Sequence, residues 1–283
     1  MNLKNIRQVI KCNIKRYIKV FENLYFLINQ EKYASFLSDQ EPVFIVGCGH
    51  SGTSIMLAIL GSHSQLYSVP YESRVFHTLS EGLASKLDVY RLSSKWKEAC
   101  LKSGKNKWIE KTPVHLFQLE RIFDFFPKAK VIIMVRDGRD VVCSLRNRGR
   151  DFQESISLWT KSIDELKKYV HDPRVMTINL EDLIKDPKGI LSEACIFIGY
   201  EYEDQILSYH EQPKYYYSNN IGKPLGAKEG KEHLELRNWQ INQPLFEETT
   251  RWKSEMILKE KEIFKRLAQK YLEDLDYVSN DQW

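Results

Sequence analysis

Cysteine is sparse in this sequence of 283 residues, and its placement excludes two common frameworks. The cysteines are far apart in the chain, and none belongs to a Cys-x-x-Cys pair. They are Cys12, Cys48, Cys100, Cys143 and Cys195. An odd and scattered set predicts neither a disulfide framework nor a zinc site, so we expect no metal and a reducing compartment.

Long apolar runs are missing as well. No stretch approaches the roughly 20 residues that a helix needs to cross a bilayer. The N-terminus has neither the uninterrupted apolar run nor the small-residue cleavage site of a secretory signal. We therefore expect a cytoplasmic protein.

Charge of one sign is not in large excess either. The formal net charge is +4, so composition predicts no nucleic-acid partner. With 42% hydrophobic residues the chain can bury a sizeable core, which excludes disorder as a description. We expect one main domain over residues 41–283, preceded by a separate segment at residues 1–40.

The N-terminal segment predicts a basic amphipathic helix over residues 1–30, followed by a linker. Apolar residues recur there at steps of three and four, with basic residues between them. The apolar positions are Leu3, Ile6, Ile10, Ile14, Tyr17, Phe21 and Tyr25, and the basic ones are Lys4, Arg7, Lys11, Lys15, Arg16 and Lys19. Such a helix packs on its own domain or on a second subunit, as in a homodimer, or it lies on an anionic membrane surface. The sequence leaves these alternatives open.

Short apolar segments alternate with helical patterns through most of the chain. Strands are predicted at residues 43–46, 107–109, 131–135 and 175–178, and helices at residues 53–60, 114–126, 139–146, 152–170 and 188–198. This order predicts an α/β fold in which helices cover both faces of a parallel sheet. An aromatic, turn-rich segment at residues 214–222 is predicted to be a surface loop.

The most informative stretch lies between the first predicted strand and the first predicted helix. Residues 47–54 read Gly-Cys-Gly-His-Ser-Gly-Thr-Ser, and the glycines allow successive backbone N–H groups to point at one anion. Thr53 stands where a nucleoside triphosphatase has its Walker lysine, and no Walker-type acid follows the later strands to hold magnesium. The stretch therefore predicts a phosphate cradle that is not built for a magnesium triphosphate. The alternative is a glycine-rich turn without a ligand.

An arginine and a serine follow the apolar run at residues 131–135. Arg136 comes directly after this run, and Ser144 follows eight residues later in the next predicted helix. Ligands of parallel sheets gather at the carboxyl ends of the strands, so Arg136 is expected beside the phosphate cradle. A guanidinium there can grip a phosphate with two hydrogen bonds. The alternative is an ion pair between Arg136 and Asp140 at the start of the helix.

Taken in order, these motifs resemble those of sulfotransferases that use 3′-phosphoadenosine 5′-phosphosulfate. Within that family the sequence looks most like the tyrosylprotein and Golgi-type branch and its bacterial relatives. The resemblance covers residues 42 to 275 and rests on five motifs. These are the cradle, Glu72-Ser73-Arg74, Lys111-Thr112-Pro113, the run MVRDGRDVVCS at residues 134–144, and Glu181-Asp182-Leu183 with Asp186-Pro187. It implies a three-layer fold like that of P-loop nucleoside triphosphatases.

The resemblance also implies a role for each matching residue. The cradle would bind the 5′-phosphosulfate of the donor through Gly49, His50, Ser51, Gly52, Thr53 and Ser54. Arg136 and Ser144 would bind the 3′-phosphate. Glu72 would be the base that takes the proton of the acceptor, with Arg74 beside it on the substrate side. Lys111 would steady charge on the sulfonate and the leaving oxygen. For Glu72 the alternative is a surface salt bridge with Arg74, and for Lys111 it is a strand-end pair with Glu110.

Three positions depart from the pattern of the family. His50 occupies the place of a lysine or arginine, and it can assist the bridging oxygen as a catalytic group only when suitably protonated. Pro113 stands where the cytosolic branch carries a histidine base, which leaves the base role to Glu72. Leu180 replaces an aromatic residue, so contacts with adenine at this position do not follow from the resemblance.

The expected function is transfer of a sulfuryl group to a hydroxyl or amine of an acceptor that the sequence does not identify. A glycan, a lipid, a small metabolite and a peptide all remain open as acceptors. Two rival functions are a small-molecule kinase with a phosphate loop and an inactive nucleotide-binding module. The missing Walker lysine argues against the first, and Glu72, Lys111, Arg136 and Ser144 together argue against the second.

Overall fold

The computed structural model describes residues 28–78, 83–224, 230–245, 250–280 and 283, together with positions 17, 20, 21, 24 and 25. Most of the helix predicted at residues 1–30 therefore lies outside the described residues. Its described positions are helical and exposed, and they are Tyr17, Val20, Phe21, Leu24, Tyr25 and Ile28. Within this described part of the chain, no helix is both long and apolar enough to span a membrane.

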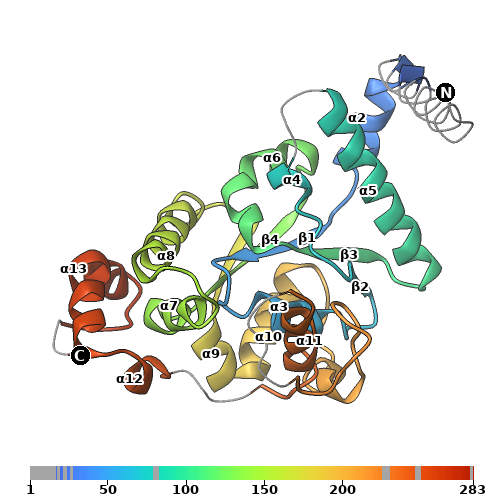
Figure 1. Ribbon diagram of the computed structural model, residues 1–283. Coiled ribbons are helices and arrows are strands. Elements are labelled where there is room, and N and C mark those ends of the chain that lie inside the picture. Colours follow the sequence, from blue (N-terminus) through green and yellow to red (C-terminus); the bar gives the residue numbers. More distant parts are fainter. Residues whose placement is uncertain are drawn as a thin grey trace, which may run out of the picture.

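A parallel sheet of five strands, in the order β2–β3–β1–β4–β5, forms the centre of the molecule (Figure 1). The strands are β1 (Val43–Gly47), β2 (Leu66–Ser68), β3 (Lys107–Lys111), β4 (Lys130–Val135) and β5 (Val175–Asn179). The four predicted strands are confirmed, and all pairings are parallel as expected. The sequence did not indicate β2, because its three residues are too few to show a period.

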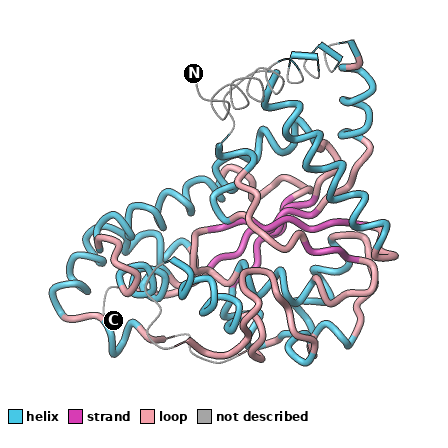
Figure 2. The backbone as a smooth tube through the Cα atoms, turned by 45° about the vertical axis from the view of Figure 1, so that its right-hand side comes forward, coloured by secondary structure: helices cyan, strands magenta, loops and turns pink. Residues whose placement is uncertain are grey.

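Helices cover both faces of this sheet, which confirms the predicted α/β class (Figures 1 and 2). Alternate side chains of β1 point to opposite faces, as the pleat of a strand requires. Phe44 and Val46 pack into a core with α5, α6, α7, α8 and α13, whereas Val43 and Ile45 pack into a core with α3, α9 and α10. The result is a three-layer molecule with two hydrophobic cores.

The helices have the following bounds. They are α2 (Gln30–Ser38), α3 (Thr53–Leu60), α4 (Val75–Thr78), α5 (Leu83–Lys102), α6 (Leu119–Phe125), α7 (Gly138–Arg146), α8 (Phe152–Lys167), α9 (Leu180–Lys185), α10 (Pro187–Phe197), α11 (Gly230–Gln240), α12 (Trp252–Glu255) and α13 (Leu258–Asp274), with 3-10 turns at Pro113–Gln118, Asp204–Ile206 and Tyr209–Glu211. The helix predicted at residues 114–126 is divided between a 3-10 turn and α6.

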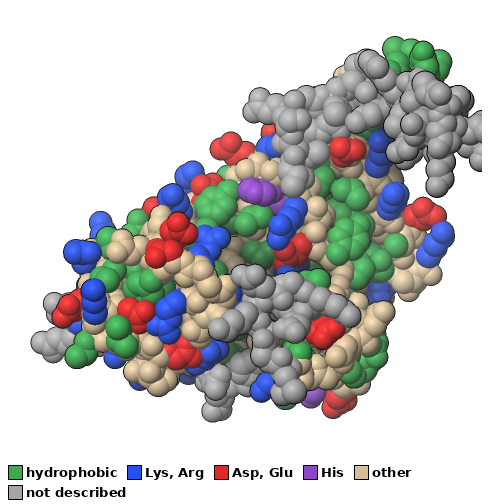
Figure 3. Space-filling model, in the orientation of Figure 1, with side chains coloured by type: hydrophobic (Ala, Val, Ile, Leu, Met, Phe, Trp, Pro, Cys, Tyr) green, Lys and Arg blue, Asp and Glu red, His purple; other side chains and the backbone are tan. Residues whose placement is uncertain are grey.

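Two further features agree with the composition. On the face shown in Figure 3, basic and acidic side chains are mixed over the described surface, in line with the small net charge. The cysteines that the structure describes, Cys48, Cys100, Cys143 and Cys195, are buried free thiols. Cys12 lies outside the described residues.

Candidate active site

The loop between β1 and α3 lies at the carboxyl end of the sheet, and glycine is required at two of its positions. Gly47 has φ +147°, and a Cβ there would lie 2.4 Å from the carbonyl oxygen of Met134 in β4. Gly52 has φ +87° and caps the start of α3. The loop therefore stays close to the neighbouring strand and turns sharply into the helix.

This turn presents the donors that an anion needs. The first backbone N–H groups of α3 have no partner within the helix, and they carry the positive end of its dipole. The Ser51 hydroxyl is buried and has no hydrogen-bond partner among the described residues. Gly49 borders the cavity above the loop, and a Cβ there would meet no described atom within 4 Å. The loop thus fits a phosphate or sulfonate group.

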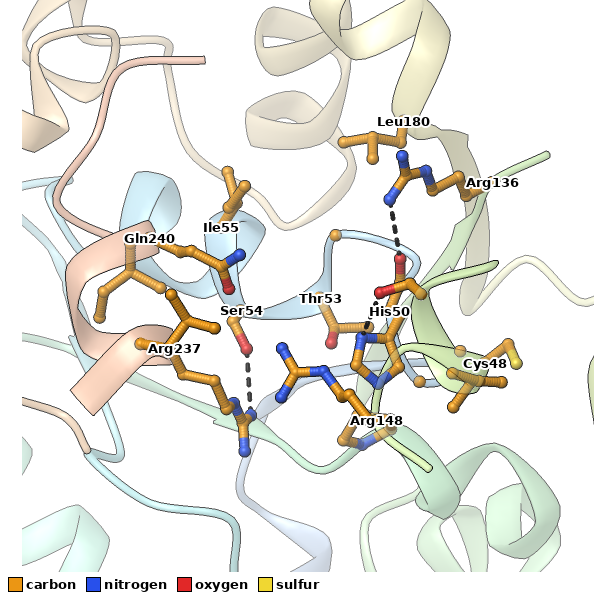
Figure 4. Close-up of a pocket in the computed structure, with 18 of the residues that line it drawn as sticks. Cys48, His50, Thr53, Ser54, Ile55, Arg136, Arg148, Leu180, Arg237 and Gln240 are labelled. Atoms are coloured by element: carbon orange, nitrogen blue, oxygen red, sulfur yellow. Dashed lines mark hydrogen bonds between the residues drawn. The ribbon is translucent and has the colours of Figure 1, made fainter. Parts of the chain in front are cut away.

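The cavity above the loop has a volume of about 1160 Å³ and is strongly cationic (Figure 4). Among the residues that the structure describes, seven arginine or lysine side chains and two carboxylates line it. The cations are Arg74, Arg136, Arg148, Arg150, Lys223, Arg237 and Arg251, and the carboxylates are Glu72 and Glu255. A ligand that carries several negative charges suits this excess of positive charge.

His50 lies in the loop with a neutral imidazole. Burial, together with the neighbouring guanidinium groups and chiefly that of Arg148, lowers its pKa to about 3. Its Nδ1 lies 3.1 Å from the Ser144 hydroxyl, and its carbonyl oxygen accepts a hydrogen bond of 3.4 Å from Arg136. In the site as it stands, His50 therefore adds no positive charge to the loop.

Arg136 and Ser144 both reach the cavity, as the sequence predicts. Arg136 Nη2 also lies 3.1 Å from Asp140 Oδ2, so the ion pair that was the alternative interpretation is present at the same time. Asp140 is held from its other side by the backbone N–H of Trp252. The pair thus orients the Arg136 guanidinium at the edge of the cavity.

Arg148 and Arg150 are among the cavity arginines that the sequence motifs did not indicate. Both follow α7, and burial lowers the pKa of Arg148, with Arg237 as the next cause. Arg148 follows Ser144 by four residues, about one helical turn. This spacing could have indicated that the two side chains lie on the same side of the chain.

Glu72, Lys111 and Arg237 form an ion cluster in which Glu72 and Arg237 line the cavity and Lys111 lies fully buried behind them. Lys111 Nζ lies 2.6 Å from Glu72 Oε1, and Arg237 Nη2 donates to the same oxygen. Arg74 is more distant, with its Nη2 3.8 Å from Glu72 Oε2, and its side chain is largely exposed. The main partner of Glu72 is therefore Lys111, not the surface bridge to Arg74 that was the alternative.

The two close cations decide the charge of Glu72. Burial by itself would raise its pKa, but Lys111 and Arg237 outweigh burial and hold the pKa at about 2. Glu72 is thus ionised in the empty site. Its proton affinity depends on whether these two cations stay with it.

Glu110 supports this cluster through Ser73, and it is not the partner of Lys111. Its Oε1 accepts hydrogen bonds from the Ser73 backbone N–H at 3.1 Å and from the Ser73 hydroxyl at 2.9 Å, and its Oε2 lies 3.1 Å from His115 Nδ1. Although burial would raise the pKa of Glu110, His115 and its other partners lower it. The buried Glu110 carboxylate therefore anchors Ser73 and with it the neighbouring Glu72.

The remaining departures noted in the sequence also lie at the cavity. Pro113 lines it where the 3-10 turn begins. Leu180 lines it beside the loop, and a Cβ on Gly52 would come within 2.8 Å of its Cδ1. Among the described residues, no group of three or more histidine, cysteine, aspartate or glutamate side chains is arranged to hold a metal ion.

Comparison with known proteins connects this geometry to a family. The sequence model of the sulfotransferase family matches residues 83–204. A protein-tyrosine sulfotransferase of Drosophila melanogaster is 24% identical over 259 residues, which cover 81% of this chain and 50% of the relative. Protein-tyrosine sulfotransferase 1 of Danio rerio is 24% identical over 208 residues, covering 61% of this chain and 57% of the relative. The chain thus spans about half the length of these relatives.

Solved structures share the fold. The sulfotransferase domain from the curacin biosynthetic pathway has a TM-score of 0.58 at 17% identity, covering 82% of this chain and 97% of that domain. The mouse sulfotransferase SULT7A1, solved in complex with PAP, has a TM-score of 0.53 at 15% identity, covering 87% of this chain and 90% of the mouse chain. In sequence the chain is thus similar to sulfotransferases over part of its length, and it shares their fold.

Proposed function

We propose that the protein transfers a sulfuryl group from 3′-phosphoadenosine 5′-phosphosulfate to a hydroxyl or amine of an acceptor. The observation that carries this proposal is the position of Glu72, which lines the same cationic cavity as the phosphate loop and lies 2.6 Å from the buried Lys111. A base and a neutralising cation thus stand beside an anion cradle. Binding of PAP by the mouse structural neighbour supports the choice of donor.

The donor fits the cavity through its two anionic ends. The loop from Gly49 to Ser54 receives the phosphosulfate, where backbone N–H groups and the dipole of α3 favour negative charge. Arg136 and Ser144 hold the 3′-phosphate, and Arg148 adds charge at the same end of α7. Recognition of that second phosphate distinguishes this donor from other adenine nucleotides.

The transfer needs one proton acceptor and one neutralising cation. Glu72 takes the proton of the acceptor as its oxygen or nitrogen forms a bond to sulfur. The bond between sulfur and the bridging oxygen breaks, and its electron pair stays on the phosphate of adenosine 3′,5′-bisphosphate. Lys111 neutralises the charge that develops on the transferring group. Because the sulfonate draws Lys111 away from Glu72, the base gains strength when the donor is bound.

Transfer of labelled sulfate tests this proposal. The purified protein is incubated with donor labelled in its sulfuryl group and with separate glycan, lipid, small-metabolite and peptide fractions. We expect label in one fraction with the wild type and almost none with Glu72→Gln. Label that appears equally with both proteins would contradict the role of Glu72, and transfer of phosphate from ATP instead would favour the kinase.

For the N-terminal segment we propose contact with an anionic membrane surface on the cytoplasmic side. Two observations support it. The described apolar positions of this segment are exposed, and the sequence places basic residues between them. Sedimentation with vesicles of phosphatidylcholine alone or with phosphatidylserine is the test, and binding only to the anionic vesicles is expected. If the protein is a dimer in solution and binds neither kind of vesicle, the proposal is wrong and packing on a second subunit is favoured.

A further inference from the structure

A C-terminal element reaches into the site, and it lies beyond the residues that match the family model. We call it the aromatic arm, and it consists of residues 214–222, α11 and the turn after α11 as far as Asn242. Two asparagines join its parts. Asn238 accepts from the Tyr217 backbone N–H at 3.2 Å and donates to the Asn220 carbonyl at 3.0 Å. Asn242 accepts from the Lys214 backbone N–H at 2.6 Å and donates to its carbonyl at 2.9 Å. The segment predicted as a surface loop is thus fixed to a helix.

The arm brings Tyr217 and Arg237 to the phosphate loop. The Tyr217 hydroxyl donates to the Ser54 hydroxyl at 3.3 Å. Arg237 Nη2 donates to the same oxygen at 3.1 Å (Figure 4). The Arg237 guanidinium lies 4.2 Å from the centre of the Tyr217 ring. Stacking on an aromatic ring favours a guanidinium over an ammonium, since the flat fork stays free to donate hydrogen bonds.

Arg237 also contacts Glu72, so one side chain connects the donor side of the cavity with the acceptor side. Ser54 lies in the first turn of α3, and Glu72 is the proposed base. The Arg237 side chain is about one-fifth exposed. Its charge is therefore weakly screened by water. The loop carries no cation of its own, because His50 is neutral, and Arg237 is placed to supply one.

We propose that Arg237 is a further catalytic residue that pairs with Glu72 in the empty site and with the sulfuryl group once the donor is bound. This inference rests on the proposed function. No bond to Arg237 forms or breaks, and the guanidinium stays protonated throughout. Its exchange of partners neutralises charge on the sulfuryl group and releases Glu72 at the step when a base is needed. The empty enzyme thereby keeps its base inactive until the donor arrives.

Binding of two nucleotides that differ by one sulfuryl group tests the inference without an acceptor. Calorimetry compares 3′-phosphoadenosine 5′-phosphosulfate with adenosine 3′,5′-bisphosphate. A hydrogen bond to a charged group is worth about tenfold or more in affinity, and the lost pair with Glu72 offsets part of it. We expect Arg237→Gln to bind the phosphosulfate about tenfold more weakly and the bisphosphate within about twofold of the wild type. Arg237→Lys keeps the charge but loses the two-pronged guanidinium. Its affinity for the phosphosulfate should lie between those of the wild type and Arg237→Gln.

Arg174→Gln is the matched control. Arg174 pairs with Asp172 just before β5 begins, at the end of the strand away from the cavity, so this variant should leave both affinities unchanged. An equal loss for both nucleotides in Arg237→Gln, or no loss for either, would overturn the inference. If Arg237→Gln does not fold, Arg237→Lys decides by the same comparison. A wild type that does not prefer the bisphosphate over AMP would instead overturn the proposed function, so the two failures are distinct.

Turnover provides the second readout, with the acceptor found by the labelled-donor assay. Loss of one donor that stabilises developing charge costs about 100- to 1000-fold in kcat, and we expect Arg237→Ala to fall in that range. Guanidinium ions added to Arg237→Ala should restore part of the activity and should leave Arg174→Ala unaffected. Full activity of Arg237→Ala without guanidinium would contradict a catalytic role.

Discussion

Two requirements conflict within the side chain of Glu72. A general base works best when its pKa lies near the working pH, yet Lys111 and Arg237 hold the pKa of Glu72 at about 2. Both cations contact the same carboxylate oxygen. A sulfonate placed between them competes for both, so the donor itself raises the proton affinity of Glu72. In the proposed reaction, the same charges keep Glu72 a weak base in the empty site and stabilise the transferring group.

Replacement of Glu72 by glutamine tests the base directly. Glutamine keeps the shape and cannot accept the proton, and general-base catalysis contributes about 100- to 10,000-fold. We expect kcat to fall by that factor. Donor affinity should not fall, because the variant frees Lys111 and Arg237 for the sulfonate. Steady-state kinetics and calorimetry measure the two effects, and near-normal turnover would reduce Glu72 to a partner of these cations.

His50 should make the stability of the empty protein depend on pH. The folded protein holds its pKa at about 3, below the ordinary value of 6.5, so the unfolded chain binds more protons between these values. Stability therefore falls as the pH drops from about 6.5 toward 3. His50→Asn removes this contribution, and its urea midpoint should decrease less than that of the wild type between pH 7 and pH 5. If the urea midpoints of the two proteins decrease equally, the pKa of His50 in the folded protein lies near its ordinary value.

At the scale of elements, the phosphate loop depends on the backbone of Gly52. An alanine in the left-handed region costs about 1–2 kcal/mol, and its Cβ would also press on Leu180. Gly104 offers a matched control, because it has φ +69° and open space around it. We expect both variants to lose stability in urea unfolding, Gly52→Ala at least as much as Gly104→Ala, whereas only Gly52→Ala should lose affinity for the bisphosphate in calorimetry. If both variants bind the bisphosphate with equal affinity, its phosphate does not bind at the loop that contains Gly52.

Some elements could be predicted from the sequence and others could not. Four strands follow from short apolar runs, and the loop at residues 47–54 follows from its glycines; both are local signals. The helix predicted at residues 114–126 begins instead as a 3-10 turn after Pro113 sets its entry. Arg237 was missed because it is 183 residues from Ser54 and 165 from Glu72, and a polar helix gives no local sign of where its arginine points. The aromatic segment was noticed, but its link to α11 depends on Asn238 and Asn242 in the fold.

At the scale of the whole molecule, the proposed reaction needs no metal. Sulfuryl transfer from this donor requires no bridging magnesium, and Thr53 replaces the lysine that a magnesium-dependent phosphate loop uses. We expect transfer activity to persist when EDTA is added to the assay. If EDTA abolishes the activity and added magnesium restores it, the kinase is favoured.

The central claim is that the cavity is built for a nucleotide with a second phosphate at its 3′ position. Calorimetry of the wild type with adenosine 3′,5′-bisphosphate, AMP and ATP with magnesium tests it most directly. We expect clear binding of the bisphosphate and a preference over AMP of about 1.5–3 kcal/mol, the value of one hydrogen bond to a charged group, and Arg136→Ala should remove most of this preference. Equal binding of the bisphosphate and AMP by the wild type, or tighter binding of ATP with magnesium, would contradict it.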